Sequence, residues 1–437
     1  MLSDAAVYIV SKLQQNGYAA YAVGGCVRDI LMGVAPHDWD IGTSAKPDEV
    51  RECFKGERVI DTGLRFGTVT VMVQDVPIQI TTFRSDGAYT DNRRPDKVAF
   101  ITALDEDLAR RDFTINAMAM DIQGNILDPF GGHADIMSKT IRCVGEPDER
   151  FNEDALRILR ALRFSGVLGF DIHISTERSM RRLKECLRSL SAERVAMELG
   201  KLLMGKNVQN VLMRFPDILC VVIPELTPLM AETQDVSYIA SWVHTARAVG
   251  IAPKDPPILW ALLLHGIHES DSYADEAGCF QANGQVTPRM GPSAAQRILR
   301  RLKLDNRTIA TVDALIMNHS NRLDSKIAVK RCLNQIGPSL FNSLLDFIQA
   351  GKAAEMFDMA PLESDKVSAA RAYYHEIIQN GECYALKDLA VSGQDLMALG
   401  IRGERLGNTL RLLLGYVMED AIPNTRAALL HKAAGIE

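Results

Sequence analysis

Two acidic residues near the N-terminus have a spacing that suits metal binding. Asp38 and Asp40 are separated by one tryptophan, and alternate side chains of a β-strand project from the same face. Two carboxylates on one face can share divalent cations, which activate an attacking hydroxyl and stabilise a departing pyrophosphate. The spacing therefore predicts phosphoryl transfer, with Asp38 and Asp40 as catalytic residues and metal ligands.

A glycine pair precedes these acids in the motif GGCVRD, residues 24–29. Glycines let a backbone approach a phosphate closely, and the N-terminus of a following helix favours anions. Arg28 adds a charged hydrogen-bond donor. A glycine pair or an isolated pair of acids would each fit an ordinary turn, but their order along the chain is more specific. We therefore assign Gly25 and Arg28 to nucleotide binding.

The elements that must position these residues change in character along the chain. Residues 1–140 contain a first helical segment and β-rich runs at 21–23, 68–73 and 78–83, punctuated by glycine and proline. From about Glu149 onward, apolar residues recur at helical spacing with few strand signals. The pattern predicts an α+β region followed by an all-helical remainder.

Composition sets broader limits. With 437 residues, 47% of them hydrophobic and 24% charged, the chain is expected to form two to four globular domains. It has no apolar run of about 18 residues, which predicts a cytoplasmic protein without membrane spans or a secretory signal. The eight cysteines lack the spacing of zinc sites or disulfide frameworks. The net charge of −6 argues weakly against nucleic acid, although the local distribution of charge matters more.

An ordered set of motifs resembles the class II tRNA nucleotidyltransferase and bacterial poly(A) polymerase family, within the polymerase β-like nucleotidyltransferases. The resemblance covers nearly the whole chain. It is carried by GGCVRD (24–29), DWD (38–40), RRDFTINA (110–117), DPFGG (128–132), EDALR (153–157), SAER (191–194) and a C-terminal stretch that begins with VSGQDL (391–396). A chance match of so many motifs in order is improbable.

The resemblance implies a fold and a cofactor. The fold would be a nucleotidyltransferase head with a small mixed sheet, followed by an all-helical neck, body and tail. The corresponding boundaries are 1–140 for the head, 141–215 for the neck, 216–360 for the body and 361–437 for the tail. Asp38 and Asp40 would hold Mg²⁺ in the head.

The EDALR motif suggests how a protein can select a base without a template. Asp154 and Arg157 are three positions apart, which predicts that they share one face of a helix. A carboxylate accepts and a guanidinium donates, so together they can pair with the amino group and ring nitrogen of cytosine or adenine. Guanine and uracil would leave polar groups unsatisfied, at about 1–3 kcal/mol each. The alternative is an i,i+4 salt bridge between Glu153 and Arg157 on an exposed helix.

Further residues are assigned to nucleotide binding. Arg160 and Arg163 continue the face of Arg157 and are expected to reach the triphosphate or the RNA, unless one of them pairs with a neighbouring acid. By resemblance, Arg111 and Asp112 bind or position the nucleotide. Asn116 is expected to fix the local backbone instead.

The resemblance leaves several activities open. Residues 82–95 resemble a flexible loop of CCA-adding and A-adding enzymes that CC-adding members lack, and 63–68 follow the CCA branch rather than the more basic poly(A) polymerases. Addition of CCA to tRNA from CTP and ATP is therefore expected first. An A-adding enzyme, a poly(A) polymerase and a catalytically silent RNA-binding relative remain alternatives.

The predicted neck is locally basic. Residues 150–214 contain 13 lysines and arginines against 7 acids. Such an excess attracts a phosphate backbone largely without reading its sequence, although charge runs are often just solvated helix faces. The candidate RNA-binding residues are Arg178, Arg181, Arg182, Lys184 and Arg188.

A segment at 260–268 resembles the core of an HD-type metal phosphohydrolase domain. The aspartate of that motif is replaced by Gly266, and 278–292 supply no following histidine. Without that oxygen ligand the usual metal cluster cannot assemble. We therefore expect no phosphohydrolase activity and interpret His244, His265 and His319 as ordinary helix residues.

Overall fold

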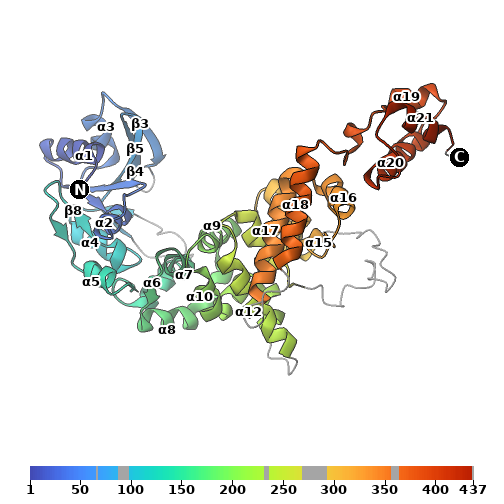
Figure 1. Ribbon diagram of the computed structural model, residues 1–437. Coiled ribbons are helices and arrows are strands. Elements are labelled where there is room, and N and C mark those ends of the chain that lie inside the picture. The colour runs from blue at the N-terminus through green and yellow to red at the C-terminus, as the bar shows by residue number, and fades with distance from the viewer. Residues whose placement is uncertain (65–66, 87–97, 231–235, 268–292, 356–363, 436–437) are drawn as a thin grey trace. The chain divides into compact units, whose positions relative to one another are not determined.

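The computed structural model describes residues 1–64, 67–86, 98–230, 236–267, 293–355 and 364–435. These residues form two compact units, Met1–Pro224 and Glu225–Glu437 (Figure 1). The first unit has a mixed sheet and the second is helical, which confirms the α+β fold class. The four-part division remains a prediction, and its boundary at 360/361 lies outside the described residues.

The head is built on a seven-stranded sheet with the order β3-β4-β5-β2-β1-β8-β9. Its strands are β1 (Ala20–Val23), β2 (Trp39–Thr43), β3 (Arg58–Gly63), β4 (Thr68–Val73), β5 (Val76–Thr82), β8 (Ala119–Met120) and β9 (Ile126–Leu127). Strands β2 and β5 pair in parallel, and all other neighbours are antiparallel. The three β-rich runs expected from the sequence therefore lie in or along this sheet.

Strand β2 occupies the middle of the sheet, between β1 and β5. Ile41 is fully buried there, as are Ile78 and Ile80 on β5. Helix α1 (Asp4–Gln15) covers one face through Ile9, Val10 and Leu13 and begins at Ser3, whose side chain accepts a hydrogen bond from the Ala6 amide. Burial on both sides fixes the register of β2, and with it the position of the two acids.

Shorter elements complete the head. They are α2 (Gly25–Leu31), α3 (Pro47–Cys53), α4 (Leu104–Ala109), η2 (Thr114–Asn116), α5 (Gly132–Met137) and the antiparallel ribbon of β6 (Arg84–Asp86) and β7 (Val98–Phe100). Gly132 must be a glycine, because a Cβ at this position would lie 2.2 Å from the carbonyl oxygen of Thr114. This close approach ties α5 to the turn that follows the RRD motif.

Helices follow in the rest of the first unit. They are α6 (Pro147–Glu153), α7 (Leu156–Leu168), α8 (Ile174–Leu183), η3 (Lys184–Ser189), α9 (Ala192–Leu203), α10 (Val208–Arg214) and α11 (Pro216–Val222). Helix α7 packs on α9 and contacts the head through Phe164, whose ring meets Phe113 edge-on at 5.8 Å.

One short strand lies within this otherwise helical region. Strand β11 (Asp171–Ile172) interrupts the helices and pairs in parallel with β10 (Thr140–Ile141), so the segment from residue 149 onward is not all-helical. Two-residue strands are too short to show an alternating pattern in the sequence. A boundary at 140/141 would also divide β10, so the head and the following helices share this small sheet.

The second unit is helical throughout its described part. Its helices are α12 (Val236–Ile251), α13 (Pro256–Leu264), α14 (Ala294–Arg301), α15 (Asn306–Asn318), α16 (Lys326–Ile336), α17 (Pro338–Glu355), α18 (Ser364–Gln379), α19 (Gly393–Ala398), α20 (Glu404–Met418) and α21 (Arg426–Ala434). The last three enclose a core that includes Leu396, Leu413 and Leu429. Within the described ranges no helix combines the length and apolar character needed to cross a bilayer.

Candidate active site

One of the two acids lies on the central strand β2, and the other immediately precedes it. Asp40 is its second residue and is half-buried, whereas the Asp38 side chain is 85% exposed. Burial raises the pKa of the Asp40 carboxyl, Arg111 lowers it, and Asp38 raises it further. Asp38 therefore lies close enough to interact with Asp40 electrostatically.

The sequence analysis placed both acids on a strand, which is wrong for Asp38. It precedes β2 by one residue, because pairing with β5 begins only at Trp39, opposite Ile78. This position leaves Asp38 in solvent beside His37, whose Nδ1 lies 3.2 Å from an Asp38 carboxylate oxygen. One acid is thus held rigidly in the sheet and the other is free to adjust.

The glycine pair forms the turn between β1 and α2. Gly24 has a φ of +80°, and its amide donates to the Met118 carbonyl at 3.0 Å. A Cβ at Gly24 would lie 2.7 Å from an Arg111 guanidinium nitrogen, so both backbone and packing require glycine. Helix α2 then begins at Gly25, as expected.

Arg28 is held on α2 by two neighbours. Its Nη1 donates to the Asn116 side-chain oxygen at 2.7 Å, and its Nε and Nη2 donate to Asp29 at 2.9 and 2.7 Å. Asn116 therefore orients a side chain as well as its local backbone. These bonds fix the guanidinium before any ligand arrives.

Arg111 lies between the glycine turn and Asp40. It donates to the Asn116 carbonyl and to an Asp107 carboxylate oxygen, both at 3.3 Å. Its Nε is buried with no hydrogen-bond partner in the described part of the chain. Burial would raise the pKa of Asp107, but Arg110 and Arg111 together bring it below its ordinary value. Arg111 is thus a fixed cation whose Nε–H remains available as a hydrogen-bond donor.

Asp112 is positioned to act through another residue. It is buried and accepts from the Phe113 amide and the Asn116 side chain. It also accepts from Arg160 Nε at 2.6 Å. Burial would raise the pKa of Asp112, but Arg160 holds it below its usual value. The geometry therefore favours a role for Asp112 in orienting Arg160 rather than in touching a nucleotide.

The placement of Asp154 corrects the expected helix geometry. Asp154 ends α6 in an extended conformation, and Arg157 lies in the first turn of α7, so the two do not share one helix face. Arg157 instead donates to Glu153 at 2.6 Å and to two backbone carbonyls, those of Arg150 and Arg110. The i,i+4 pair with Glu153 is therefore present, and the break between α6 and α7 is the reason that Asp154 turns elsewhere.

Asp154 pairs with a residue that the sequence analysis did not assign. Arg194 Nη2 donates to Asp154 Oδ2 at 2.6 Å, and the Leu156 amide donates to Oδ1 at 3.0 Å. The Nη1 of Arg194 is buried and makes no hydrogen bond to any residue that the structure describes. The Asp154 carboxylate is thus fixed in orientation, with an unused donor beside it.

Arg160 and Arg163 each have an acidic partner. Arg160 pairs with Asp112, and Arg163 Nε lies 3.2 Å from a carboxylate oxygen of Glu198, which is 1% exposed. Burial lowers the pKa of Arg163, Glu198 raises it, and the nearby charges of Arg160 and Arg28 lower it again. Three of the predicted nucleotide-binding arginines therefore converge, although each is anchored by a carboxylate.

Most of the predicted RNA-binding residues are engaged within the protein. Arg181 and Lys184 both pair with Asp217, Arg182 pairs with Asp148, and Arg188 pairs with Glu185. A local count of charges missed these pairs, because three of the four join residues more than thirty positions apart. Arg178 is exposed and has no ion-pair partner among the described residues.

We expect Arg178, which is exposed, and Arg181, which is held in an ion pair, to behave differently in an RNA-binding assay. Replacing Arg178 by alanine should weaken tRNA binding about two- to fivefold and reduce its salt dependence, because one backbone contact is lost. Replacing Arg181 should instead lower the melting temperature, since Arg181 joins α8 to Asp217 and to the Arg214 carbonyl. Filter binding at several salt concentrations and thermal melts of both variants measure this. Equal tRNA affinities for wild type and the Arg178 variant would contradict it.

The HD-like segment of the second unit holds a cluster of aromatic rings. The ring centroid of His265 lies 5.5 Å from that of His244 and 6.3 Å from that of His319. The ring of Phe347 contacts the rings of both His265 and His319. Each histidine has a nitrogen within 3 Å of a backbone carbonyl oxygen. The interpretation as helix residues fits His244 on α12, whereas His265 and His319 end their helices.

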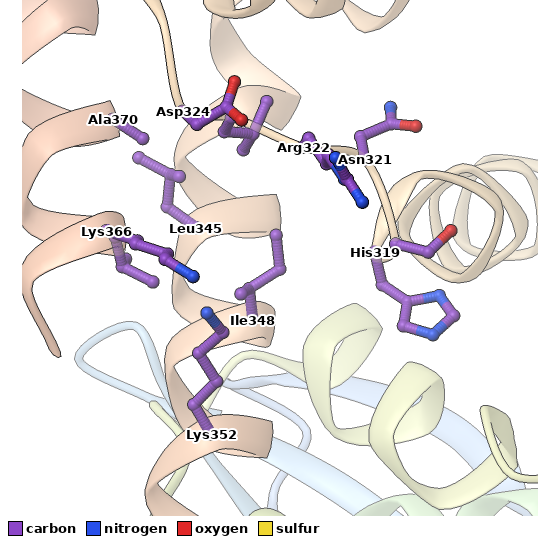
Figure 2. Close-up of a pocket in the computed structure, with 12 residues that line it drawn as sticks. His319, Asn321, Arg322, Asp324, Leu345, Ile348, Lys352, Lys366 and Ala370 are labelled. Atoms are coloured by element: carbon purple, nitrogen blue, oxygen red, sulfur yellow. The ribbon is translucent and has the colours of Figure 1, made fainter. Parts of the chain in front are cut away.

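A pocket of about 520 Å³ opens beside His319 in this unit (Figure 2). Leu345, Ile348 and Val367 form apolar parts of its lining, and Arg322, Lys352 and Lys366 add positive charge. None of the predicted catalytic or nucleotide-binding residues lines it. All of the predicted catalytic and nucleotide-binding residues lie in the first unit.

The residues of the first unit fit a divalent cation and a triphosphate. Mg²⁺ is commonly bound through one or two carboxylates together with substrate phosphates, and Asp38 and Asp40 supply such a pair. Among the described residues no larger group of three histidine, cysteine or acidic side chains forms a metal cage. Arg28, Arg111, Arg160 and Arg163 offer guanidiniums for the phosphates. A mixed sheet that carries this set defines a nucleotidyltransferase head.

Family models and relatives agree with this class. The poly A polymerase head domain matches residues 20–142, a probable RNA- and SrmB-binding site of polymerase A matches 169–230, and a putative tRNA nucleotidyltransferase domain 2 matches 285–433. The CCA-adding enzyme of Levilactobacillus brevis is 35% identical over 97% of this chain and 95% of its own. That of Enterococcus faecalis is 32% identical over 97% and 93%. The chain belongs to the family of CCA-adding enzymes.

Solved structures show the same architecture. The Bacillus stearothermophilus CCA-adding enzyme in complex with CTP matches with a TM-score of 0.73 and 29% identity, covering 98% of this chain and 96% of that one. The Thermotoga maritima CCA-adding enzyme complexed with tRNA matches with a TM-score of 0.62 at 20% identity, covering 99% and 94%, and supports the fold alone.

Proposed function

We propose that the protein adds cytidine, cytidine and adenosine in turn to the 3′ end of tRNA, using CTP and ATP with Mg²⁺ and releasing pyrophosphate. The observation that carries the proposal is the placement of Asp40 on β2 and of Asp38 directly before it, in one unit with the fixed Asp154 and the convergent arginines. The names of the relatives support tRNA as the acceptor. A cytoplasmic location belongs to the same proposal, because the proposed acceptor is tRNA.

Each residue of the candidate site has a proposed task in this reaction. Asp38 and Asp40 would hold the metal ions, which lower the pKa of the attacking hydroxyl and neutralise charge on the triphosphate. The 3′ oxygen of the tRNA forms a bond to the α-phosphorus, and the α–β bridge breaks as pyrophosphate leaves. Arg28, Arg111, Arg160 and Arg163 bind the phosphates, and Asp112 keeps Arg160 oriented.

Base selection is proposed to depend first on Asp154. Its carboxylate is fixed by Arg194 and the Leu156 amide, so it can accept a hydrogen bond from the amino group shared by cytosine and adenine. Arg157 already donates three hydrogen bonds within the protein. For Arg157 to read the ring nitrogen of the base, one of its remaining N–H groups must turn toward the base or one of these bonds must open.

Three acceptors distinguish this function from the alternatives. Incubation of the protein with tRNAs that end before the first C, after CC and after CCA, with one labelled nucleotide at a time, should give CMP addition to the first, AMP addition to the second and no addition to the third. An A-adding enzyme would extend only the second, and a poly(A) polymerase would extend the third. The segment 87–97, within the loop on which the preference for CCA addition partly rested, lies outside the described residues.

A further inference from the structure

Phe164 lies where the predicted nucleotide-binding arginines meet. It belongs to α7, its ring is 8% exposed, and none of the sequence motifs singled it out. The guanidinium of Arg163 lies 4.2 Å from the ring centroid, and those of Arg28 and Arg160 lie 5.5 Å from it. Three cations from two helices thus share one aromatic ring.

The acidic partners of these arginines do not explain why the three converge. Arg28 pairs with Asp29, Arg160 with Asp112 and Arg163 with Glu198, so each guanidinium is anchored to a different carboxylate. Like charges at such close quarters repel one another, and the pKa of Arg163 is lowered first by burial and then also by the charges of Arg160 and Arg28. The ring is a neighbour that all three share, and an aromatic face attracts cations without using their N–H donors.

The ring is itself held in a fixed orientation. Phe113, which follows the RRD motif, meets it at an interplanar angle of 83° with the centroids 5.8 Å apart. Phe113 is fully buried, and its amide donates to Asp112, the partner of Arg160. The head therefore fixes the ring from one side, while α2 and α7 bring the arginines to it.

We propose that Phe164 is a positioning residue for the nucleoside triphosphate: its ring holds Arg28, Arg160 and Arg163 side by side, with N–H donors left available for the phosphates. The inference rests on the proposed function, because it takes these arginines as the triphosphate site. A guanidinium has five N–H groups, and a carboxylate on one edge leaves the others available. Aligning three guanidiniums in advance lowers the entropic cost of gripping a flexible triphosphate.

The test compares two buried phenylalanines in the same unit. Phe164→Leu keeps an apolar side chain but removes the aromatic face, whereas Phe164→Tyr keeps the face. The matched control is Phe215→Leu, because Phe215 is 1% exposed and also lies beside two arginines, Arg181 at 5.2 Å and Arg214 at 5.5 Å, which have no proposed contact with the nucleotide. Where the leucine variant unfolds, Phe164→Met fills the space with a flexible apolar chain.

The measurements separate positioning from a purely structural role. Calorimetric titration with tripolyphosphate and with CTP, in the presence of Mg²⁺, should show about tenfold weaker binding of both to Phe164→Leu, with tRNA affinity unchanged. The KM for CTP should rise more than kcat falls, and Phe164→Tyr should restore most of the affinity. Phe215→Leu should lower the melting temperature while leaving the affinity for both phosphates at the wild-type value.

Two outcomes would overturn the inference. If wild type and Phe164→Leu bind tripolyphosphate and CTP equally while the melting temperature falls, Phe164 is a core residue only, and the proposed function stands. If the wild-type protein binds neither compound, the proposed function fails and takes the inference with it. The wild-type titration therefore distinguishes the two failures.

Discussion

Asp40→Asn is expected to abolish nucleotide incorporation while leaving the protein folded and slightly more stable. Activity should fall by at least about a thousandfold, because the variant loses a negatively charged ligand for the metal ions that organise the triphosphate. Stability should rise because Asp40 is a half-buried carboxyl beside Asp38, and asparagine has the same shape without the charge. In many enzymes, residues that are needed for activity lower the stability of the folded protein.

The gain in stability of the Asp40→Asn variant should depend on pH in a definite direction. Burial raises the pKa of Asp40 in the folded state, so the stability linked to its protonation is complete below the unfolded-state pKa and is lost as the pH rises through the folded-state pKa. The melting temperature of the asparagine variant should therefore match that of wild type in acid and exceed it near neutrality. Thermal melts at a series of pH values from acid to neutral, in the absence of divalent ions, measure the difference.

Asp48→Asn provides the matched control for this experiment. Asp48 lies on α3 in the same unit and makes one ion pair with Arg51 on its own helix. This variant should retain full activity and should gain no stability. In addition, Mg²⁺ together with CTP should raise the melting temperature of wild type and of Asp48→Asn but not of Asp40→Asn. Appreciable nucleotide incorporation by Asp40→Asn would remove Asp40 from the metal site.

Asp154→Ala is expected to relax base choice rather than to stop catalysis. The preference for CTP and ATP over UTP and GTP should fall by about ten- to a hundredfold, which corresponds to the 1–3 kcal/mol of a hydrogen bond between a buried acceptor and the base. Most of the change should be a loss of kcat/KM for CTP and ATP, because the variant no longer offers an acceptor to their amino groups. Single-nucleotide incorporation with each of the four triphosphates measures the ratio.

The comparison variant for base choice is Asp148→Ala. Asp148 lies on α6 and pairs with Arg182 and Ser179, so its removal also breaks an ion pair between helices. It has no proposed contact with the base, and its removal should leave the ratio of the four nucleotides unchanged. If Asp154→Ala discriminates as well as wild type does, the carboxylate does not select the base. A parallel loss in both variants would point instead to a general disturbance of α6.

Local sequence patterns were sufficient to predict most of the helices and strands and part of the site. The alternation around Asp38 and Asp40 predicted their proximity, and the helical spacing after residue 149 predicted most of the neck and the second unit. The glycine pair predicted the turn into α2. These features follow from steric rules that act over two to four residues, so they can be read from the chain alone.

The orientation of the site was decided by contacts between distant residues. Arg28 meets Asn116 across 88 positions, Arg160 meets Asp112 across 48, and Arg194 meets Asp154 across 40. The same kind of contact neutralises three of the five neck cations that a local charge count assigned to RNA, namely Arg181, Arg182 and Lys184. Periodicity and propensity carry information over one or two turns of helix only, whereas the partner of a charged side chain depends on how whole helices pack. The sequence alone therefore determined which chemical groups the site has, and the tertiary structure decided which of them are already paired and which remain available for a ligand.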